Sequence, residues 1–376
     1  MKIAIEASIL QRKNKTGVDY YTQCLVDELS SQMKGDQFEL GYFEKDGNKP
    51  GIKGANISYY PIKNITRRLY GAFFRLGLGL PYDSLAKLKA DIAIFPDFVI
   101  WPLAKIKKSI VVIYDTAYLD VPQYVAPRLI KYLSRFVPRS AKKASKIITI
   151  SEYTKKSLMR HYGLGSEGIV VINPAVNHNI FRERSRSEID KVKAKYGIKK
   201  EYLLYLGTIE PRKNIEGIID AYSGLDESIK NEYELVLAGG KGWLDDEIQK
   251  KISSNINKIG YVDEADIPAL YSGAKIFLYP SHYEGWGMQI LESMACGTPV
   301  ITANNSSLSE AGGSAAIYIN NNDSQDLKDK ISLLLNDKTL YSKSVQMGIK
   351  HAGQFTWQKS AIKLKSTIEE LAVDTA

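Results

Sequence analysis

Short runs of β-branched and other apolar residues recur along this chain, and segments with helical periodicity separate them. In the first half the runs lie at residues 2–7, 91–95, 109–115 and 146–151. Their length and composition are typical of strands buried in a parallel sheet, because helices cover both faces of such a sheet. The alternation predicts a doubly wound α/β domain.

The same pattern restarts in the second half, after a mixed segment at 173–200. Further strand-like runs lie at 202–207, 233–240, 256–262, 274–281 and 298–304. A chain of 376 residues is long enough for two such domains. In this class of sheet ligands bind at the carboxyl ends of the strands, so a cleft between two facing domains is the expected site.

The predicted boundaries give three parts. Residues 1–175 form an N-terminal Rossmann-type domain, and residues 176–355 form a C-terminal Rossmann-type domain. Residues 356–376 form a terminal helix, with apolar positions at helical spacing. The sequence does not decide which domain that helix packs on, and packing back on the N-terminal domain is one of the two possibilities.

Composition and charge narrow the class of protein. An apolar content of 44% and a charged content of 25% are ordinary for globular chains. The two cysteines, Cys24 and Cys296, fall in apolar helical patterns and are expected as free thiols. The N-terminus lacks a signal-peptide pattern, and no apolar run is long enough to span a bilayer, which favours a cytoplasmic protein that is soluble or peripheral to the membrane.

The positive charge is concentrated in the first half. Residues 1–175 hold 27 Lys and Arg against 15 Asp and Glu, whereas the remainder holds 24 against 27. This asymmetry suggests that one half meets an anionic partner: a membrane surface, a lipid phosphate or nucleic acid. Nucleic acid is disfavoured because no motif that reads DNA or RNA is present.

The first candidate site is the segment LGTIEPRKN, residues 206–214. It ends a strand and opens a helix, with Pro211 expected in the first helical turn. Arg212 and Lys213 beside free backbone N–H groups would suit a diphosphate. By itself, the pattern fits equally well a solvated helix start with incidental charge.

The second candidate site is SHYEGWGMQILESMACGTPVI, residues 281–301. Glu284 precedes a Gly-x-Gly turn, and Glu292 follows eight residues later. At ~1.5 Å per residue their helical separation is roughly 12 Å, too far for a paired acid and base, so two separate hydrogen-bonding roles are expected. Ordinary surface glutamates on an amphipathic helix are the alternative.

Motifs for other chemistry are missing from the sequence. There is no phosphate loop of the GxxxxGK[ST] type, no HExxH, no Cys-x-x-Cys pair and no GxSxG. A nicotinamide oxidoreductase is disfavoured because neither half has GxGxxG after its first strand.

Five segments in order resemble glycosyltransferase family 4, whose members retain anomeric configuration and have the GT-B fold. They are KTGVDYYTQCLVDEL, TISEYTKKSL, LGTIEPRKN, EGWGMQILE with its Glu-x7-Glu spacing, and NSSLSEAGGSAAIYI. The EPRKN form resembles mannosyltransferases of bacterial polysaccharide assembly. The resemblance implies a metal-independent hexosyltransferase that uses a nucleotide-sugar, with GDP-mannose favoured over a UDP-sugar, and a glycan or lipid-linked acceptor.

The resemblance also implies roles for the domains and for single residues. Residues 1–175 would be the acceptor-binding domain, and residues 176–355 would be the nucleotide-sugar-binding domain. Arg212 and Lys213 would neutralise the leaving diphosphate, and Glu284 would bind sugar hydroxyls. Three further donor contacts are implied: backbone amides of Gly287 and Met288, and Glu292 on the ribose. Gly17, in the first loop, would lie against the donor phosphate or the acceptor.

One departure from the family pattern concerns Tyr114 and Asp115, which stand where relatives carry His-Asp in contact with the sugar. A phenol is a poorer acceptor than an imidazole. The alternative function is therefore a catalytically silent GT-B scaffold that supports a partner glycosyltransferase.

Two basic stretches suit an anionic membrane interface at the inner face of the membrane. Residues 67–80 mix arginines with aromatic residues, and residues 128–142 place basic residues at helical spacing, with an interruption expected at Pro138. A solvated helix face is the alternative interpretation.

Overall fold

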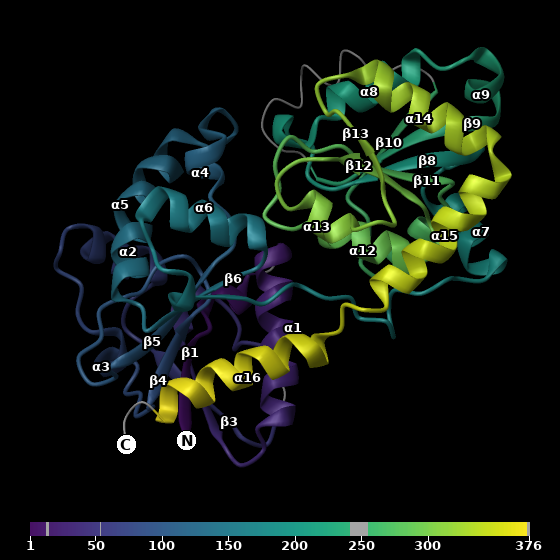
Figure 1. Ribbon diagram of the computed structural model, residues 1–376. Helices are drawn as coiled ribbons and strands as arrows, with labels where there is room; N and C mark the ends of the chain where they lie inside the picture. Colours follow the sequence, from purple (N-terminus) through teal and green to yellow (C-terminus); the bar gives the residue numbers. More distant parts are fainter. Residues whose placement is uncertain (13–14, 53, 241–254, 374–376) are drawn as a thin grey trace. The chain divides into compact units, whose positions relative to one another are not determined.

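The computed structural model describes residues 1–12, 15–52, 54–240 and 255–373, and it divides the chain into two compact units (Figure 1). Unit 1 comprises Met1–Pro174 together with Trp357–Ala376, and unit 2 comprises Ala175–Thr356. Each unit contains one parallel sheet flanked by helices. The prediction of two doubly wound α/β halves is confirmed.

The sheet of unit 1 has seven parallel strands in the order β3-β2-β1-β4-β5-β6-β7. Its strands are β1 (Lys2–Glu6), β2 (Gln37–Phe43), β3 (Ile57–Ile62), β4 (Ile92–Phe95), β5 (Lys108–Ile113), β6 (Lys146–Thr149) and β7 (Ile169–Val171). The central strands are buried almost throughout, as expected for strands that helices cover on both faces.

The helices of unit 1 connect these strands. They are α1 (Gly17–Gln32), α2 (Arg67–Arg75), α3 (Tyr82–Leu85), α4 (Ala117–Asp120), α5 (Pro127–Lys143), α6 (Glu152–Tyr162) and α16 (Trp357–Val373). Local sequence sets their ends: Ser151 caps α6 by accepting from the Thr154 N–H (3.1 Å), and Gly163 ends it with φ 62°.

The interruption predicted at Pro138 is wrong, because α5 is continuous from Pro127 to Lys143. Pro138 removes one backbone donor and usually kinks a helix. Here Phe136 and Val137, on the same turn, are buried in the core of unit 1 and keep the helix in place.

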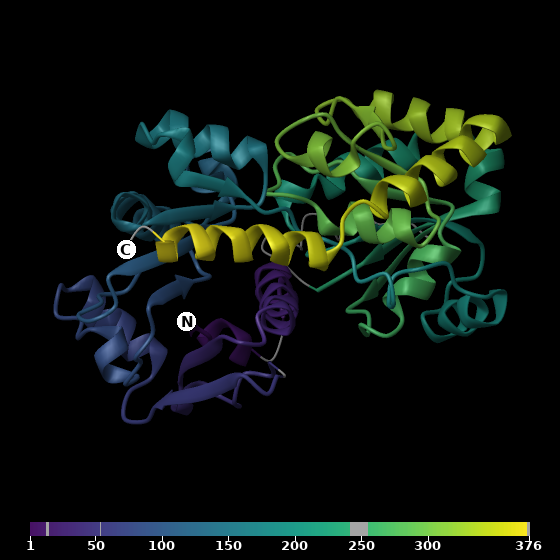
Figure 2. The same ribbon diagram turned by 60° about the horizontal axis from the view of Figure 1, so that its bottom comes forward.

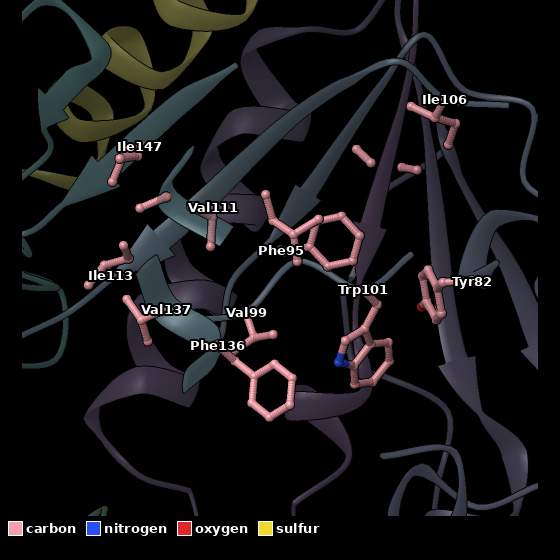
Figure 3. Close-up of a cluster of buried hydrophobic side chains, with 14 of the residues drawn as sticks. Tyr82, Phe95, Val99, Trp101, Ile106, Val111, Ile113, Phe136, Val137 and Ile147 are labelled. Carbon is pink, nitrogen blue, oxygen red and sulfur yellow. The ribbon is translucent and has the colours of Figure 1, made fainter. Parts of the chain in front are cut away.

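An aromatic cluster forms much of the core of unit 1 (Figure 3). The ring centroids of Tyr82 and Trp101 lie 5.2 Å apart, and those of Tyr82 and Phe95 lie 6.1 Å apart. Close aromatic packing of this kind stabilises a core beyond its buried area. The cluster includes Trp101 and so fixes the loop after β4, which carries Asp97.

The terminal helix α16 belongs to unit 1, where it packs against α1 (Figures 1 and 2). The apolar positions predicted from its periodicity, Ala361, Leu364, Ile368 and Leu371, are all buried. Trp357 contacts Tyr21 of α1 edge to face at 5.8 Å, and the Ser360 hydroxyl donates to the Asn173 carbonyl (2.7 Å).

The sheet of unit 2 has six parallel strands in the order β10-β9-β8-β11-β12-β13. Its strands are β8 (Glu201–Leu206), β9 (Tyr233–Ala238), β10 (Ile256–Gly260), β11 (Ile276–Tyr279), β12 (Val300–Ala303) and β13 (Ile317–Ile319). Its described helices are α7 (Arg186–Lys195), α8 (Ile215–Ser223), α9 (Glu227–Glu232), α11 (Ile267–Gly273), α12 (Met288–Ala295), α13 (Leu308–Gly312), α14 (Ser324–Asn336) and α15 (Lys338–Ala352).

Candidate active site

The basic dipeptide lies at the carboxyl edge of the unit 2 sheet, beyond β8. A short 3-10 turn, η5 (Pro211–Lys213), carries it, and α8 begins only at Ile215. Pro211 thus stands in a first helical turn as expected, but this turn is the separate 3-10 turn and not the start of α8. Asn214 separates turn and helix because its backbone is left-handed (φ 57°) and its side chain accepts from the Gly217 N–H (3.3 Å).

Asn214 also fixes the turn against neighbouring loops. Its amide donates to the Pro280 carbonyl, just past β11, at 3.2 Å and to the Asn321 carbonyl at 2.8 Å. Only a residue that tolerates positive φ and bonds on both sides suits this position. The turn is thus held rigidly beside the carboxyl end of β11.

Glu284 bridges the two predicted cations. Its Oε2 accepts from Arg212 Nη1 at 3.0 Å, and its Oε1 accepts a short hydrogen bond from Lys213 Nζ. Lys213 also donates to the Tyr279 hydroxyl (3.0 Å). The second arm of Arg212 donates to Glu210 (2.8 Å). The structure therefore brings Arg212, Lys213 and Glu284 into one network.

Burial sets the electrostatics of this network. The Glu284 and Lys213 side chains are only 9% and 8% exposed. Burial raises the pKa of Glu284, but the charges of Arg212 and Lys213 outweigh it and lower that pKa to about 2. Burial and the charge of Arg212 lower the pKa of Lys213. The carboxylate is ionised and charge-balanced.

Two serines that follow β12 hold the Glu284 loop. The Glu284 N–H donates to Ser306 Oγ (3.1 Å), and Ser307 Oγ donates to the carbonyls of Glu284 (2.8 Å) and Trp286 (3.2 Å). Ser306 is left-handed, with φ 45°. These serines belong to the NSSLSEAGG segment, to which the sequence analysis assigned no role. Glu210 and Tyr279, which also contact the network, do not stand out in the sequence either.

Gly287 begins α12 with φ 109°, and Met288 is the first helical residue. A β-carbon on Gly287 would lie 3.2 Å from Leu308 Cδ2 and 3.3 Å from Ile290 Cδ1. The helix therefore starts directly after Gly287, which is its N-cap. The first N–H groups of a helix lack intrahelical acceptors and favour anions, which gives this loop a positive end next to the cation network.

Glu292 lies within α12 in a different environment. Its Oε2 accepts from the Tyr271 hydroxyl at 3.4 Å. Burial raises the pKa of Glu292 to about 7, and the Tyr271 hydrogen bond lowers it only in part. The two glutamates of the Glu-x7-Glu pattern thus have opposite pKa shifts, in keeping with separate roles.

The remaining predicted residues belong to unit 1. Gly17 is the exposed first residue of α1, which a capping box of Thr16 and Asp19 begins. Asp115 accepts from the Ala117 N–H (3.0 Å). Tyr114 is 4% exposed; its hydroxyl donates to the Pro96 carbonyl (2.9 Å), and its ring packs on Tyr21.

A cluster of three or more His, Cys, Asp or Glu side chains suited to a metal ion is not found within the described ranges. Across those same ranges, no helix is both long and apolar enough to cross a bilayer.

Family models match both halves of the chain. Residues 17–180 match Glycosyltransferase Family 4, and residues 187–351 match Glycosyl transferases group 1. An O-antigen chain mannosyltransferase B of Escherichia coli is 32% identical over 260 residues, which are 68% of this chain and 68% of that protein. The chain belongs to glycosyltransferase family 4.

More distant matches agree with this family 4 assignment. A serotype-specific mannosyltransferase, WbdA of Escherichia coli, is 30% identical over 227 residues, 58% of this chain but only 28% of that longer protein. Sucrose-phosphate synthase from Thermosynechococcus elongatus has a similar fold, with a TM-score of 0.77 at 17% identity over 99% of each chain. The family 4 enzyme has the GT-B fold and is a retaining, metal-independent hexosyltransferase.

Proposed function

We propose that this enzyme transfers a hexose, with mannose favoured, from a nucleoside-diphosphate sugar to a glycan or lipid-linked acceptor in cell-surface polysaccharide synthesis. GDP-mannose is the favoured donor, and a UDP-sugar is the alternative. The observation that carries the proposal is the Arg212–Glu284–Lys213 network beside the start of α12. The mannosyltransferase names of two relatives support the choice of sugar.

The network is suited to a leaving diphosphate. Transfer breaks the bond between the sugar C1 and a phosphate oxygen while the acceptor oxygen bonds to C1 from the same face. The acceptor proton passes to that leaving phosphate oxygen, so no protein nucleophile is required. Arg212 and Lys213, already oriented by Glu284, stabilise the negative charge that develops on the phosphate.

The other predicted residues have ligand contacts of their own in this proposal. Glu284 has a further acceptor capacity for sugar hydroxyls, and the Gly287 and Met288 amides bind sugar or phosphate oxygens. Glu292 accepts from the ribose hydroxyls. In unit 1, Gly17 contacts the donor phosphate or the acceptor, and Asp115 contacts the sugar. The Tyr114 hydroxyl is engaged by the Pro96 carbonyl, so Tyr114 acts through its packing.

Nucleotide binding and turnover test the proposal together. GDP, UDP and ADP should be compared by thermal unfolding, because a ligand that binds only the folded state must raise its stability. We expect GDP to raise the Tm most and GDP-mannose to be consumed when an acceptor is present. No stabilisation and no turnover with any GDP- or UDP-sugar would favour the silent scaffold instead.

We also propose that unit 1 docks on an anionic membrane, which would place the enzyme in the cytoplasm at the inner face. Five large apolar side chains of α2 and the following loop are exposed, namely Leu69, Phe73, Leu76, Leu78 and Leu80. A pocket of about 300 Å³ beside them is lined by Arg75, Arg135, Arg139 and Lys143 with Phe74 and Phe136. Exposed leucines next to basic residues suit a lipid surface.

Co-sedimentation with vesicles tests this docking. We expect binding to vesicles with 30% phosphatidylglycerol and little binding to pure phosphatidylcholine. The double variant Arg135→Glu/Arg139→Glu should abolish binding, whereas Lys343→Glu in unit 2 should not. Binding that ignores the anionic lipid or the two arginines would contradict the proposal.

A further inference from the structure

The charged network of unit 2 follows the two strands at the centre of its sheet, β8 and β11. The chain leaves β8 toward β9 and leaves β11 toward β12, on opposite sides, so β8 and β11 flank the topological switch point. Ligands of open α/β sheets bind beyond the carboxyl ends of the strands at this point. Arg212 and Lys213 follow β8, and Glu284 follows β11.

Unit 1 has its own switch point, between β1 and β4, and it also carries a charged cluster. The chain leaves β1 toward β2 and leaves β4 toward β5. Glu6 is the last residue of β1, and Asp97 lies two residues beyond β4. Arg67, the first residue of α2, contacts both: its Nη2 lies 2.7 Å from Asp97 Oδ2 and 4.0 Å from Glu6 Oε2.

Glu6 is buried, and the described residues do not supply it with a full set of hydrogen-bond donors. It is only 3% exposed, and among those residues the hydrogen bond to it is from the Ser8 N–H (3.1 Å). At 4.0 Å, Arg67 is beyond hydrogen-bond distance. Burial raises the pKa of Glu6, and the charge of Arg67 lowers it only in part. Oxygen atoms of this carboxylate therefore remain able to accept from a ligand.

Ser8 provides a second polar group of the same kind. Its residue is 5% exposed, and its hydroxyl lies close enough to the Glu6 carboxylate to lower the pKa of that group, but within the described part of the chain this hydroxyl makes no hydrogen bond of normal geometry. A buried hydroxyl without a partner costs free energy. A ligand hydroxyl that bonds to Ser8 and Glu6 together would remove that cost.

The surrounding charge indicates what kind of ligand fits. Arg12 lies 3.5 Å from Asp97 and 3.2 Å from Asp19, so among the residues that the structure describes the cluster holds three carboxylates and two guanidinium groups. An excess of negative charge disfavours a phosphate or a carboxylate ligand. Carboxylates and an arginine together suit the hydroxyl groups of a neutral sugar, which both donate and accept.

We propose that Glu6, Ser8, Arg67 and Asp97 form the subsite for the neutral terminal sugar of the acceptor. This inference rests on the proposed function, because that function requires an acceptor hydroxyl. Glu6 and Asp97 accept from sugar hydroxyls, and Arg67 donates to a sugar oxygen. Arg67 keeps its place through Asp97 and through the Trp101 ring, 5.6 Å from its guanidinium carbon.

The test separates acceptor binding from donor binding. Methyl α-mannopyranoside serves as the neutral acceptor probe, and GDP-mannose serves as the donor. Glu6→Gln and Asp97→Asn should each raise the acceptor KM about ten-fold or more, as expected for loss of a hydrogen bond to a charged group. The donor KM and the Kd for GDP should stay within two-fold, as should every constant of the control Glu44→Gln, an exposed acid of unit 1.

Saturation-transfer NMR with methyl α-mannopyranoside measures binding without turnover. We expect a signal from the wild-type protein that weakens in both variants and persists in Glu44→Gln. Asp97 is 25% exposed, so Asp97→Asn keeps the test open if Glu6→Gln fails to fold. An unchanged acceptor KM in a folded variant, an equal NMR signal in wild type and variants, or no wild-type signal would overturn the inference.

The outcomes also distinguish this inference from the proposed function. If the function fails, nucleotides do not stabilise the wild-type protein and no donor is consumed, whatever the sugar probe does. If only the inference fails, wild-type transfer persists and the variants keep the wild-type acceptor KM. Tighter binding of mannose 6-phosphate than of methyl α-mannopyranoside would likewise overturn the assignment to a neutral sugar.

Discussion

Glu284 and Lys213 form a buried ion pair, 71 positions apart in the sequence, in which the carboxylate Oε1 accepts from the ammonium. Arg212 contacts the other carboxylate oxygen. Burying charges is costly unless they are paired and hydrogen-bonded. The pair therefore ties the EPRKN turn after β8 to the loop after β11 and keeps both cations oriented.

Loss of either cation should impair transfer. Arg212→Ala or Lys213→Ala is expected to lower kcat/KM for transfer by at least about 100-fold, the scale found when a preorganised charge contact is removed. Lys343→Ala, an exposed lysine of α15, is the control and should transfer at the wild-type rate. Near-wild-type rates in both single variants would remove the donor-site assignment.

The stability of the protein should depend on Glu284 in a defined pH window. Its pKa is about 2 in the folded state against 4.5 as the reference value, so its stabilising contribution is present above pH 4.5. That contribution is lost as the pH falls from 4.5 toward 2. Glu284→Gln should lower the free energy of unfolding by about 3 kcal/mol at pH 7, and the deficit should shrink below pH 4.5.

Urea unfolding at a series of pH values measures this difference. Glu227→Gln is the matched control, because Glu227 pairs with Lys230 at 2.8 Å but is 79% exposed. Removing that exposed pair should change the free energy of unfolding by less than about 1 kcal/mol. Equal effects of the two substitutions at pH 7 would contradict the buried ion pair.

Nucleotide affinity should rise with pH because of Glu292. Burial raises its pKa to about 7, and the proposed ribose contact requires the ionised carboxylate. The Kd for GDP should therefore fall by about ten-fold from pH 6 to pH 8. GDP itself also titrates, so the decisive quantity is the difference from Glu292→Gln, in which this part of the pH dependence should vanish. Identical pH profiles would refute the role of Glu292.

Gly287→Ala should disturb the start of α12. The backbone there has φ 109°, and the added β-carbon would lie 3.2 Å from Leu308. Strain of this kind costs about 1–3 kcal/mol, so the Tm should fall and the affinity for GDP should weaken. Gly35→Ala, where nothing lies within 4 Å of the new carbon, should leave both unchanged. A Gly287→Ala protein with wild-type Tm and GDP affinity would show that the loop is not constrained.

The sequence predicted the elements with simple periodicity. Every strand expected from a β-branched run is present, because full burial selects such residues. Strands β2 and β3 were missed: β2 carries Glu39 and Gly41, and β3 carries Pro61. Proline is tolerated in β3 because it is an edge strand of its sheet. Strands β7 and β13 were also missed, because a strand of only three residues shows no clear pattern in the sequence.

The sequence named the candidate residues of the site but not their contacts. The motif spacing identified Arg212, Lys213 and Glu284, yet nothing local to either segment shows that Glu284 pairs with both cations. That contact depends on the parallel pairing of β8 with β11. The holding role of Ser306 and Ser307 likewise depends on tertiary structure, since each bonds to a residue more than 20 positions away.

The most direct test of the donor site compares GDP with guanosine by titration calorimetry, in the wild-type protein and in Arg212→Ala and Lys213→Ala. The two ligands differ only in the diphosphate that the cations are proposed to bind. We predict that the wild-type protein binds GDP at least about 100-fold more tightly than guanosine, and that each variant loses most of this ratio while its affinity for guanosine is kept. A GDP-to-guanosine ratio that is the same in all three proteins would contradict the account.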